Sequence, residues 1–272
     1  MNVKKLAVIG GGVMAEAFIC GLLSRGLINP ADIIVGEPVA ERRVYLGRYG
    51  MAVTDDNQAA ARATDVLLLA VKPQVVAGVM ANLAQAVAPP TLVLSIVAGL
   101  PVAAIREALP TAAVVRIMPN TPAQAGEGMS VWFATPEVTA DQADWVKTIL
   151  ATLGDELQLS DEKYVDMATA ISGSGPAYVF LFVEALADAG VRLGLTKEIA
   201  LRLAWQTVRG SAAYGQGSQQ HPAMLRNMVT SPGGTTAEAL YTLEQHGLRA
   251  AIADAVWACY QKALDLGRRA QA

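Results

Sequence analysis

Cysteine and histidine are scarce in this chain, which has only two of each. Cys20 and Cys259 lie far apart in apolar helical contexts, a pattern typical of small core residues in a reducing compartment rather than of disulfides. His221 and His246 are not accompanied by a cysteine cluster, so the ligands that a protein-built zinc site needs are missing. We therefore expect no metal site.

Charged residues are also scarce. They make up only 17% of the 272 residues, and the formal net charge is −3. Basic residues gather only in pairs such as Arg42-Arg43 and Arg268-Arg269, so we expect no nucleic-acid partner. The start, Met1 to Leu6, lacks a signal-peptide pattern, and no uninterrupted apolar run reaches membrane-span length. The sequence predicts a cytoplasmic protein whose abundant apolar surface lies in a subunit interface rather than in a membrane.

Two patterns divide the sequence near residue 160. Before it, short apolar runs that suit buried strands alternate with segments of helical spacing, which predicts a parallel sheet covered on both faces. The predicted strands are 6–9, 33–35, 66–71, 92–96, 114–117, 128–133 and 156–159, and the predicted helices are 13–24, 40–49, 74–87, 102–109 and 139–153. We expect an α/β fold whose N-terminal domain, residues 1–160, is a Rossmann-type doubly wound sheet that binds a dinucleotide.

After residue 160 the strand pattern stops, and Ser160-Asp161-Glu162 has the composition of a helix start. Helical spacing continues over 178–193, 196–214, 222–228, 236–246 and 248–269. Residues 161–272 are therefore predicted to form an all-α C-terminal domain. Two segments interrupt it, Ile171 to Tyr178 and Val229 to Thr236, and both are rich in glycine and hydroxyl side chains.

A glycine-rich turn follows the first predicted strand. Its residues match the G-x-G-x-x-A form of a dinucleotide-binding turn and are Gly10, Gly11, Gly12, Val13, Met14 and Ala15. Gly10 permits a tight turn, Gly12 lets a pyrophosphate approach the backbone, and the small Ala15 allows the helix to pack closely on the strand. The pyrophosphate would then meet the N-terminus of the first helix.

Four other predicted strand ends face the same crevice. Glu37 ends the second strand, where an acidic residue normally bonds a ribose 2′-hydroxyl and repels a 2′-phosphate, so it favours NADH over NADPH. Arg42 and Arg43 could instead receive that phosphate, and the preference between NADH and NADPH stays open. The remaining strand ends each contribute residues that we expect to line the cofactor, namely Ala70, Lys72, Pro73, Ala98 and Asn120.

Val229 to Thr236 reads Val-Thr-Ser-Pro-Gly-Gly-Thr-Thr between two helical segments. A proline and two adjacent glycines end the first helix, and the backbone N–H groups and hydroxyls at the start of the next can receive a small anion. A plain Ser-Pro turn with a threonine helix cap is the alternative interpretation of this segment taken alone.

Five segments together closely resemble pyrroline-5-carboxylate reductases. In chain order they are the glycine turn, Val71-Lys72-Pro73, Asn120-Thr121-Pro122, Ser172-Gly173-Ser174-Gly175-Pro176-Ala177-Tyr178 and Val229 to Thr236. The resemblance implies an NAD(P)H-dependent reduction of 1-pyrroline-5-carboxylate to L-proline. It also implies a helical domain that forms a dimer, dimers that assemble into rings, and an active site in which the cofactor of one subunit meets the glycine-rich loop of its partner.

The resemblance also assigns roles to single residues. Asn57 joins the cofactor site, Thr236 bonds the ring nitrogen as the catalytic residue, and the substrate carboxylate is held by Ser231, Gly233, Gly234 and Thr235. Gln219 marks a departure, because some relatives carry a carboxylate close to the substrate there, and we expect no acidic residue to act. Since a protonated imine is already electrophilic, positioning is the main demand on the protein.

Two other functions are compatible with parts of the pattern. A β-hydroxyacid dehydrogenase has the same plan of a Rossmann domain followed by helices. It would place a lysine in the helical active site, whereas the candidates Lys163 and Lys197 lie outside any glycine-rich segment. A protein that binds a dinucleotide without turnover would have no use for the anion loop at Ser231 to Thr236. Both explain less of the sequence than a reductase does.

Overall fold

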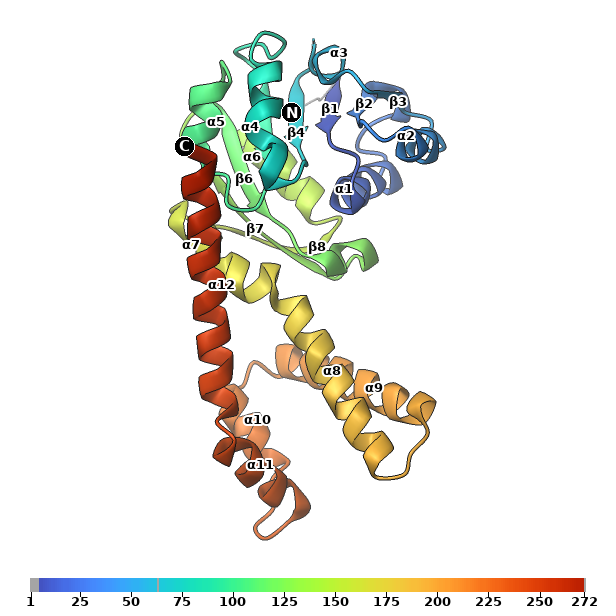
Figure 1. Ribbon diagram of the computed structural model, residues 1–272, viewed down its shortest axis with the longest axis vertical. Helices are drawn as coiled ribbons and strands as arrows, with labels where there is room; N and C mark the ends of the chain where they lie inside the picture. Colours follow the sequence, from blue (N-terminus) through green and yellow to red (C-terminus); the bar gives the residue numbers. More distant parts are fainter. Residues whose placement is uncertain (1–4, 63, 272) are drawn as a thin grey trace. The chain divides into compact units, whose positions relative to one another are not determined.

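The structure, a computed structural model, describes residues 5–62 and 64–271, and the N-terminal part of the chain is built on an eight-stranded sheet (Figure 1). The strands lie in the order β3-β2-β1-β4-β5-β6-β7-β8. Their bounds are β1 (Leu6–Ile9), β2 (Ile33–Gly36), β3 (Ala52–Thr54), β4 (Val66–Leu69), β5 (Leu92–Ser95), β6 (Val114–Met118), β7 (Gly128–Ala134) and β8 (Gly154–Gln158). Every neighbouring pair is parallel except β6 and β7. The first six strands therefore have the predicted doubly wound order.

Helices cover both faces of this sheet, as its continuous apolar strands predict. Along β1, Leu6 and Val8 belong to one buried cluster, while Ala7 and Ile9 belong to a second. The first cluster includes residues of α1 (Val13–Ser24), α2 (Ala40–Gly47) and α6 (Ala140–Leu150), and the second includes residues of α3 (Asn57–Ala61), α4 (Pro73–Leu83) and α5 (Val102–Ala108). The sheet is thus buried on both faces, and the loops that the sequence predicts to hold the cofactor leave its carboxyl edge.

Helices follow the last strand. α7 (Lys163–Ala168) continues through a π-helical turn (Thr169–Gly173) into α8 (Gly175–Arg192). The remaining helices are α9 (Lys197–Ser218), α10 (Pro222–Met228), α11 (Thr235–Gln245) and α12 (Leu248–Gln271). The predicted interruption between Ile171 and Tyr178 is therefore a widened turn within a helical stretch. Such π turns are frequent at functional sites.

The chain divides into two compact units. One comprises Met1–Ser174 together with Ala258–Ala272, and the other comprises Gly175–Trp257. The second unit has a small core between α8 and α9, built from Val183, Ala187, Ala200 and Ala204. The predicted boundary near residue 160 marks the change from strands to helices. The compact units divide later because α7 packs against β6 and β7, and because Gly173 of the π turn lies against Met118 of β6.

Candidate functional site

The glycine turn joins β1 to α1 at the centre of the sheet. Gly10 has φ +97°, a left-handed conformation, and its N–H donates to the Gly36 carbonyl at 2.8 Å. A Cβ on Gly10 would lie 2.8 Å from the Ala70 carbonyl oxygen. Only glycine fits where the neighbouring strand ends approach this closely, which confirms the predicted tight turn.

The N-terminus of α1 is open to an anion. Gly12 is the N-cap residue without any side-chain cap, and a Cβ on Gly12 would meet no atom within 4 Å. An uncapped start of a helix this long offers backbone N–H groups and the positive end of the helix dipole. The missing Cβ leaves the space that a pyrophosphate would take. The residues present therefore fit the phosphate part of a dinucleotide.

Glu37 at the end of β2 is buried, and both of its carboxylate oxygens are engaged. Oε2 accepts the Gly11 N–H at 2.8 Å, and Oε1 accepts the Val39 N–H at 2.9 Å. Because each carboxylate oxygen has a further lone pair, Glu37 can still accept a ribose hydroxyl. The sequence predicts only that ribose contact; the structure adds that Glu37 holds the glycine turn itself in place.

Arg42 and Arg43, the two candidates for a 2′-phosphate, already have partners within the protein. The Nε of Arg42 donates to the Gly11 carbonyl, and its Nη2 pairs with Glu16 Oε2 at 2.6 Å. Arg43 Nη1 donates to the Glu37 carbonyl at 2.7 Å. Because a guanidinium has five N–H donors, a 2′-phosphate could share either arginine with these acceptors, and the preference between NADH and NADPH stays open.

Glu16, in the first turn of α1, is a neighbour of the site that sequence reasoning missed. Its Oε1 accepts the hydroxyls of Tyr49 at 2.7 Å and Tyr45 at 3.0 Å. Burial raises the pKa of Glu16, but hydrogen bonds from Tyr49, Arg42 and Tyr45 and the charge of Arg42 outweigh it, so the pKa lies below its ordinary value. The bond to Glu16 raises the pKa of Tyr49 in turn. The cluster fastens α2 to α1 behind the glycine turn.

The other residues predicted to line a cofactor lie at the same edge of the sheet. They lie in the segment between a strand and the next helix or begin that helix, and they are Asn57, Ala70, Lys72, Pro73, Ala98 and Asn120. The side chain of Asn57 lies against Gly36 at the end of β2. The carboxyl ends of parallel strands share one edge, so the fold brings these residues together beside the glycine turn. Their contact with a cofactor stays a prediction.

Asn120 links the end of β6 to the π turn. Its Nδ2 donates to the Ser172 carbonyl at 3.0 Å, and its Oδ1 accepts the Met129 N–H at 2.8 Å. A Cβ on Gly173 would lie 2.8 Å from the terminal methyl of Met118, so the turn packs closely on the strand. The Asn120 amide, which the sequence predicts to line the cofactor, therefore also fixes the position of the π turn.

In the helical unit, a loop between Met228 and Thr235 separates α10 from α11, as predicted. Gly233 has φ +67°, and the Gly234 N–H donates to the Ser231 carbonyl at 3.0 Å. The Ser-Pro turn of the alternative interpretation is therefore present, but Gly234 is the N-cap of α11 and no side chain caps it, so the threonine cap of that interpretation is wrong. The N–H groups at this helix start can therefore serve another acceptor.

Comparisons with known proteins agree with this arrangement. Residues 5–99 match the family model "NADP oxidoreductase coenzyme F420-dependent", and residues 162–266 match "Pyrroline-5-carboxylate reductase dimerisation". A pyrroline-5-carboxylate reductase of Synechocystis is 46% identical over 266 residues, which cover 97% of this chain and 99% of that protein. The chain belongs to the pyrroline-5-carboxylate reductase family.

Solved structures of the family superpose on the whole chain. The pyrroline carboxylate reductase of Plasmodium falciparum with NADP bound is 32% identical, with a TM-score of 0.89 and coverage of 98% of this chain and 99% of that one. The pyrroline-5-carboxylate reductase of Coxiella burnetii is 36% identical, with a TM-score of 0.88 and the same coverage. The resemblance inferred from five segments is confirmed along the full length.

Gln219, where some relatives carry a carboxylate, and the two lysines considered for a dehydrogenase, Lys163 and Lys197, have structural explanations. Gln219, with φ +55°, ends α9 in a left-handed conformation. Lys163 pairs with Asp161 at 2.9 Å, and Lys197 pairs with Asp188, all four side chains being about half exposed. Neither lysine occupies an enclosed polar site of the kind that a β-hydroxyacid dehydrogenase would need.

Cys20 and Cys259 are free, half-buried thiols, and Cys259 Sγ lies 3.2 Å from Ser174 Oγ at the end of the π turn. Within residues 5–62 and 64–271, no three His, Cys, Asp or Glu side chains gather in a group that could hold a metal ion.

Replacing Glu16 with glutamine tests the cluster that joins α2 to α1. Because the folded-state pKa of Glu16 is depressed, its carboxylate stabilises the fold above the unfolded pKa, near 4.5, and this contribution is lost as the pH falls through the folded pKa. At pH 7 we expect Glu16→Gln to lower the free energy of unfolding by on the order of 1–2 kcal/mol, as charged hydrogen bonds do.

Denaturant unfolding over a pH series measures this difference. The gap between wild type and Glu16→Gln should be constant near neutral pH and should close in acid. Glu41→Gln, which removes an exposed carboxylate from the first turn of α2, is the matched control. A gap that does not change with pH would contradict the depressed pKa.

Proposed function

We propose that this protein reduces 1-pyrroline-5-carboxylate to L-proline with a reduced nicotinamide cofactor, the last step of proline biosynthesis. Two observations carry the proposal. The chain belongs to this family, and two of its helices begin at a glycine without a side-chain cap, α1 at Gly12 and α11 at Gly234. The first helix start suits a pyrophosphate and the second suits a carboxylate. The relatives that match from end to end, one of them solved with NADP bound, support the same function.

The surroundings of the glycine turn favour NADH in this proposal. The carboxylate of Glu37 lies at the end of β2, where a negative charge opposes a 2′-phosphate and accepts a ribose hydroxyl. Arg42 and Arg43, which would offset that charge, are held by Glu16 and by the Glu37 carbonyl. The pyrophosphate would bind at Gly10 to Ala15, and the other residues at the strand ends would line the remainder of the cofactor.

The loop before α11 offers a partner for each polar group of the substrate. The N–H groups at the start of the helix and the hydroxyls of Ser231 and Thr235 would hold the carboxylate, with Gly233 and Gly234 leaving the backbone accessible. The Thr236 hydroxyl oxygen would accept the N–H of the protonated imine. When bound, the reduced nicotinamide supplies the hydride that the imine carbon accepts. The protein's main task is then to hold the reacting groups in contact.

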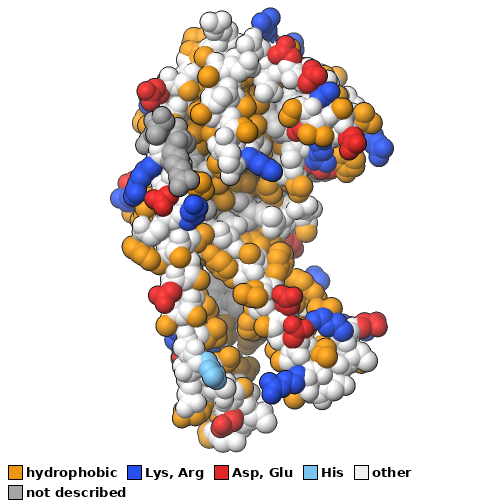
Figure 2. All heavy atoms as spheres, in the orientation of Figure 1, with side chains coloured by type: hydrophobic (Ala, Val, Ile, Leu, Met, Phe, Trp, Pro, Cys, Tyr) orange, Lys and Arg blue, Asp and Glu red, His pale blue; other side chains and the backbone are white. Residues whose placement is uncertain are grey.

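The helical unit exposes apolar side chains that we propose a second copy covers. Figure 2 shows hydrophobic side chains at the surface of its helices, and the exposed large ones include Leu181, Leu193, Tyr241, Ile252 and Trp257. Since residues 162–266 match a dimerisation model, another subunit is the natural occupant of this surface. In the proposed dimer, the loop of one subunit serves the cofactor bound by its partner, and dimers assemble into rings as the resemblance implies.

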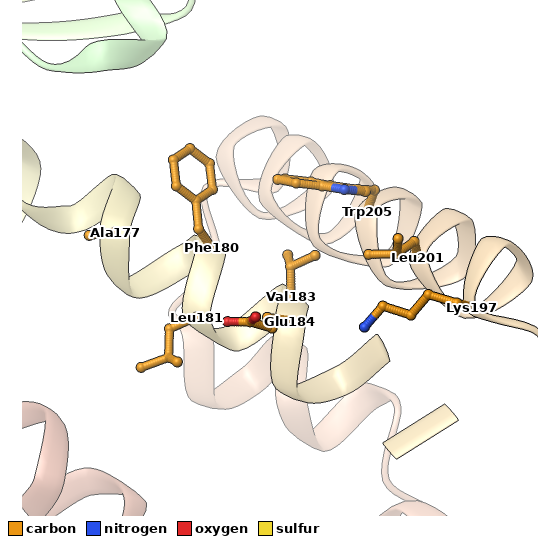
Figure 3. Close-up of a pocket in the computed structure, with 8 residues that line it drawn as sticks. All are labelled: Ala177, Phe180, Leu181, Val183, Glu184, Lys197, Leu201 and Trp205. Atoms are coloured by element: carbon orange, nitrogen blue, oxygen red, sulfur yellow. The ribbon is translucent and has the colours of Figure 1, made fainter. Parts of the chain in front are cut away.

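A groove between α8 and α9 belongs to this surface. It has a volume of about 510 Å³ and, as Figure 3 shows, is lined from α8 by Phe180, Leu181, Val183 and Glu184 and from α9 by Lys197, Leu201 and Trp205. The rings of Phe180 and Trp205 meet edge to face with centroids 6.0 Å apart. Aromatic side chains of this kind dominate the energetics of protein interfaces, which supports burial by a second copy.

One helical stretch bears on the prediction that the chain has no membrane-spanning segment. Within the part of the chain that the structure describes, Lys163–Arg192 is long and apolar enough to cross a membrane by length and composition. The sequence does not suggest this, because Ser172 to Gly175 interrupt the apolar run, whereas the structure carries the helix through them. Apolar helices at subunit interfaces meet the same criterion. We propose that a second subunit, rather than lipid, buries this stretch in a cytoplasmic enzyme.

Turnover by the purified protein tests the proposed function. The oxidation of NADH and of NADPH is followed separately by absorbance with 1-pyrroline-5-carboxylate as substrate. We expect turnover with both and a higher kcat/KM with NADH, because Glu37 opposes the 2′-phosphate. No turnover with either cofactor would refute the function, and a higher kcat/KM with NADPH would refute the role of Glu37. Oxidation of 3-hydroxy acids with NAD⁺ is the comparison that tests the dehydrogenase alternative.

Thr236→Ala tests the proposed contact with the imine nitrogen. We expect kcat/KM for the imine to fall about 10- to 100-fold, because a hydrogen bond to a charged group is worth about 1.5–3 kcal/mol, and the Kd for NADH to stay unchanged. Thr236→Ser should recover most of the rate. Thr242→Ala removes a hydroxyl that bonds the Glu238 carbonyl on the same helix and is the control. Full activity of Thr236→Ala would remove Thr236 from the mechanism.

A further inference from the structure

A buried arginine in β6 is not explained by the cofactor and substrate sites. Arg116 is 3% exposed and lies among apolar strand residues. Its Nη1 donates to Glu162 Oε1 at 2.9 Å and to Asp166 Oδ2 at 3.2 Å, and its Nη2 donates to Asp166 Oδ1. One guanidinium therefore binds two carboxylates at the start of α7, within the same compact unit.

Glu162 extends this cluster to a third segment. The Oε1 atom that binds Arg116 also accepts the backbone N–H of Val102 at 2.8 Å. Val102 is the first residue of α5 and follows the loop that contains Ala98. A shift of Glu162 would therefore move the start of α5 and, with it, the loop after β5.

Asp166 connects the cluster to the π turn, which begins three residues later. That turn contacts the same strand further along: Gly173 packs closely on Met118, and Asn120 donates to the Ser172 carbonyl. Arg116 thus binds the helical stretch at Asp166, and the end of β6 contacts the same stretch at the π turn.

Stability alone is a poor reason for such a cluster. Taking a guanidinium and two carboxylates out of water carries a penalty that their attraction only offsets, and apolar residues of similar volume often stabilise a core equally well or better. An ion cluster adds direction, since the planar guanidinium binds carboxylates in a fixed fork. The arrangement therefore sets the relative positions of β6, α5 and α7.

We propose that Arg116 is a positioning residue for the nicotinamide end of the cofactor site. Through Glu162 and Asp166 it fixes the loop after β5, Asn120 and the π turn relative to one another. The inference rests on the proposed function, in which Ala98 and Asn120 line the part of the cofactor beyond the pyrophosphate, where the nicotinamide would lie. A displacement of about 1 Å at such a position can slow a reaction by about 10²-fold.

Two variants separate positioning from folding. Arg116→Lys keeps the positive charge but loses the fork. Arg116→Met combined with Asp166→Leu replaces most of the ion cluster by apolar side chains of similar length. Arg106→Met is the control, because Arg106 lies in the last turn of α5 and forms an ion pair with Glu137 that is about 40% exposed.

Four measurements are made on each variant: Tm, kcat, the Kd for NADH by fluorescence titration, and amide hydrogen exchange in residues 169–173. For folded Arg116 variants we expect a kcat lowered about 10- to 100-fold, a raised Kd for NADH and faster exchange in the π turn. The control should match wild type in all four. Folded variants with wild-type kcat, Kd and exchange would overturn the inference, even if their Tm were lowered.

These measurements distinguish a failure of the inference from a failure of the proposed function. If the double variant does not fold, Arg116→Lys decides by the same measurements. Binding of NADH and hydrogen exchange are read without turnover. Wild-type protein that fails to reduce 1-pyrroline-5-carboxylate would therefore refute the proposed function, while these two readouts would still decide the role of Arg116.

Discussion

The close approach of three strand ends around Gly10 is the constraint on which the rest of the structure depends. On one side the Gly36 carbonyl accepts the Gly10 N–H, and on the other the Ala70 carbonyl leaves no room for a Cβ. Because the chain must turn at once into α1, that helix begins at the edge of the sheet with Gly12 uncapped. A tight backbone contact thus leaves an uncapped helix start that could receive an anion without a charged side chain.

The parts of the fold that follow from local sequence could be predicted. Apolar strand runs, the glycine turn and the break before α11 all obey short-range rules of the backbone. β3 could not be predicted because Ala52–Thr54 is only three residues long and lies at the edge of the sheet. The antiparallel direction of β7 has no signal in its composition. The stretch from Lys163 to Arg192 reads as interrupted because glycines usually end a helix, whereas a π turn accommodates Gly173.

The contacts that hold the site together lie beyond what a single sequence reveals. Glu16 binds a tyrosine 33 residues away, and Arg116 binds a carboxylate 50 residues away, so no spacing rule points to either. The position of Glu37 follows from the end of β2, but its bond to Gly11 depends on how the glycine turn curves. These side chains each join two segments at the carboxyl edge. The backbone creates the site, and a few buried polar contacts then set its geometry.

One active site, in our proposal, joins the glycine turn of one subunit to the loop before α11 of its partner. Complementation tests this directly. Gly12→Asp places a negative charge in the open phosphate space, Thr236→Ala removes the hydroxyl at the imine, and co-expression with two affinity tags isolates mixed dimers. A mixed dimer should regain about half of the wild-type activity, because one of its two symmetric sites is intact. Activity no higher than that of the parent variants would contradict a shared site.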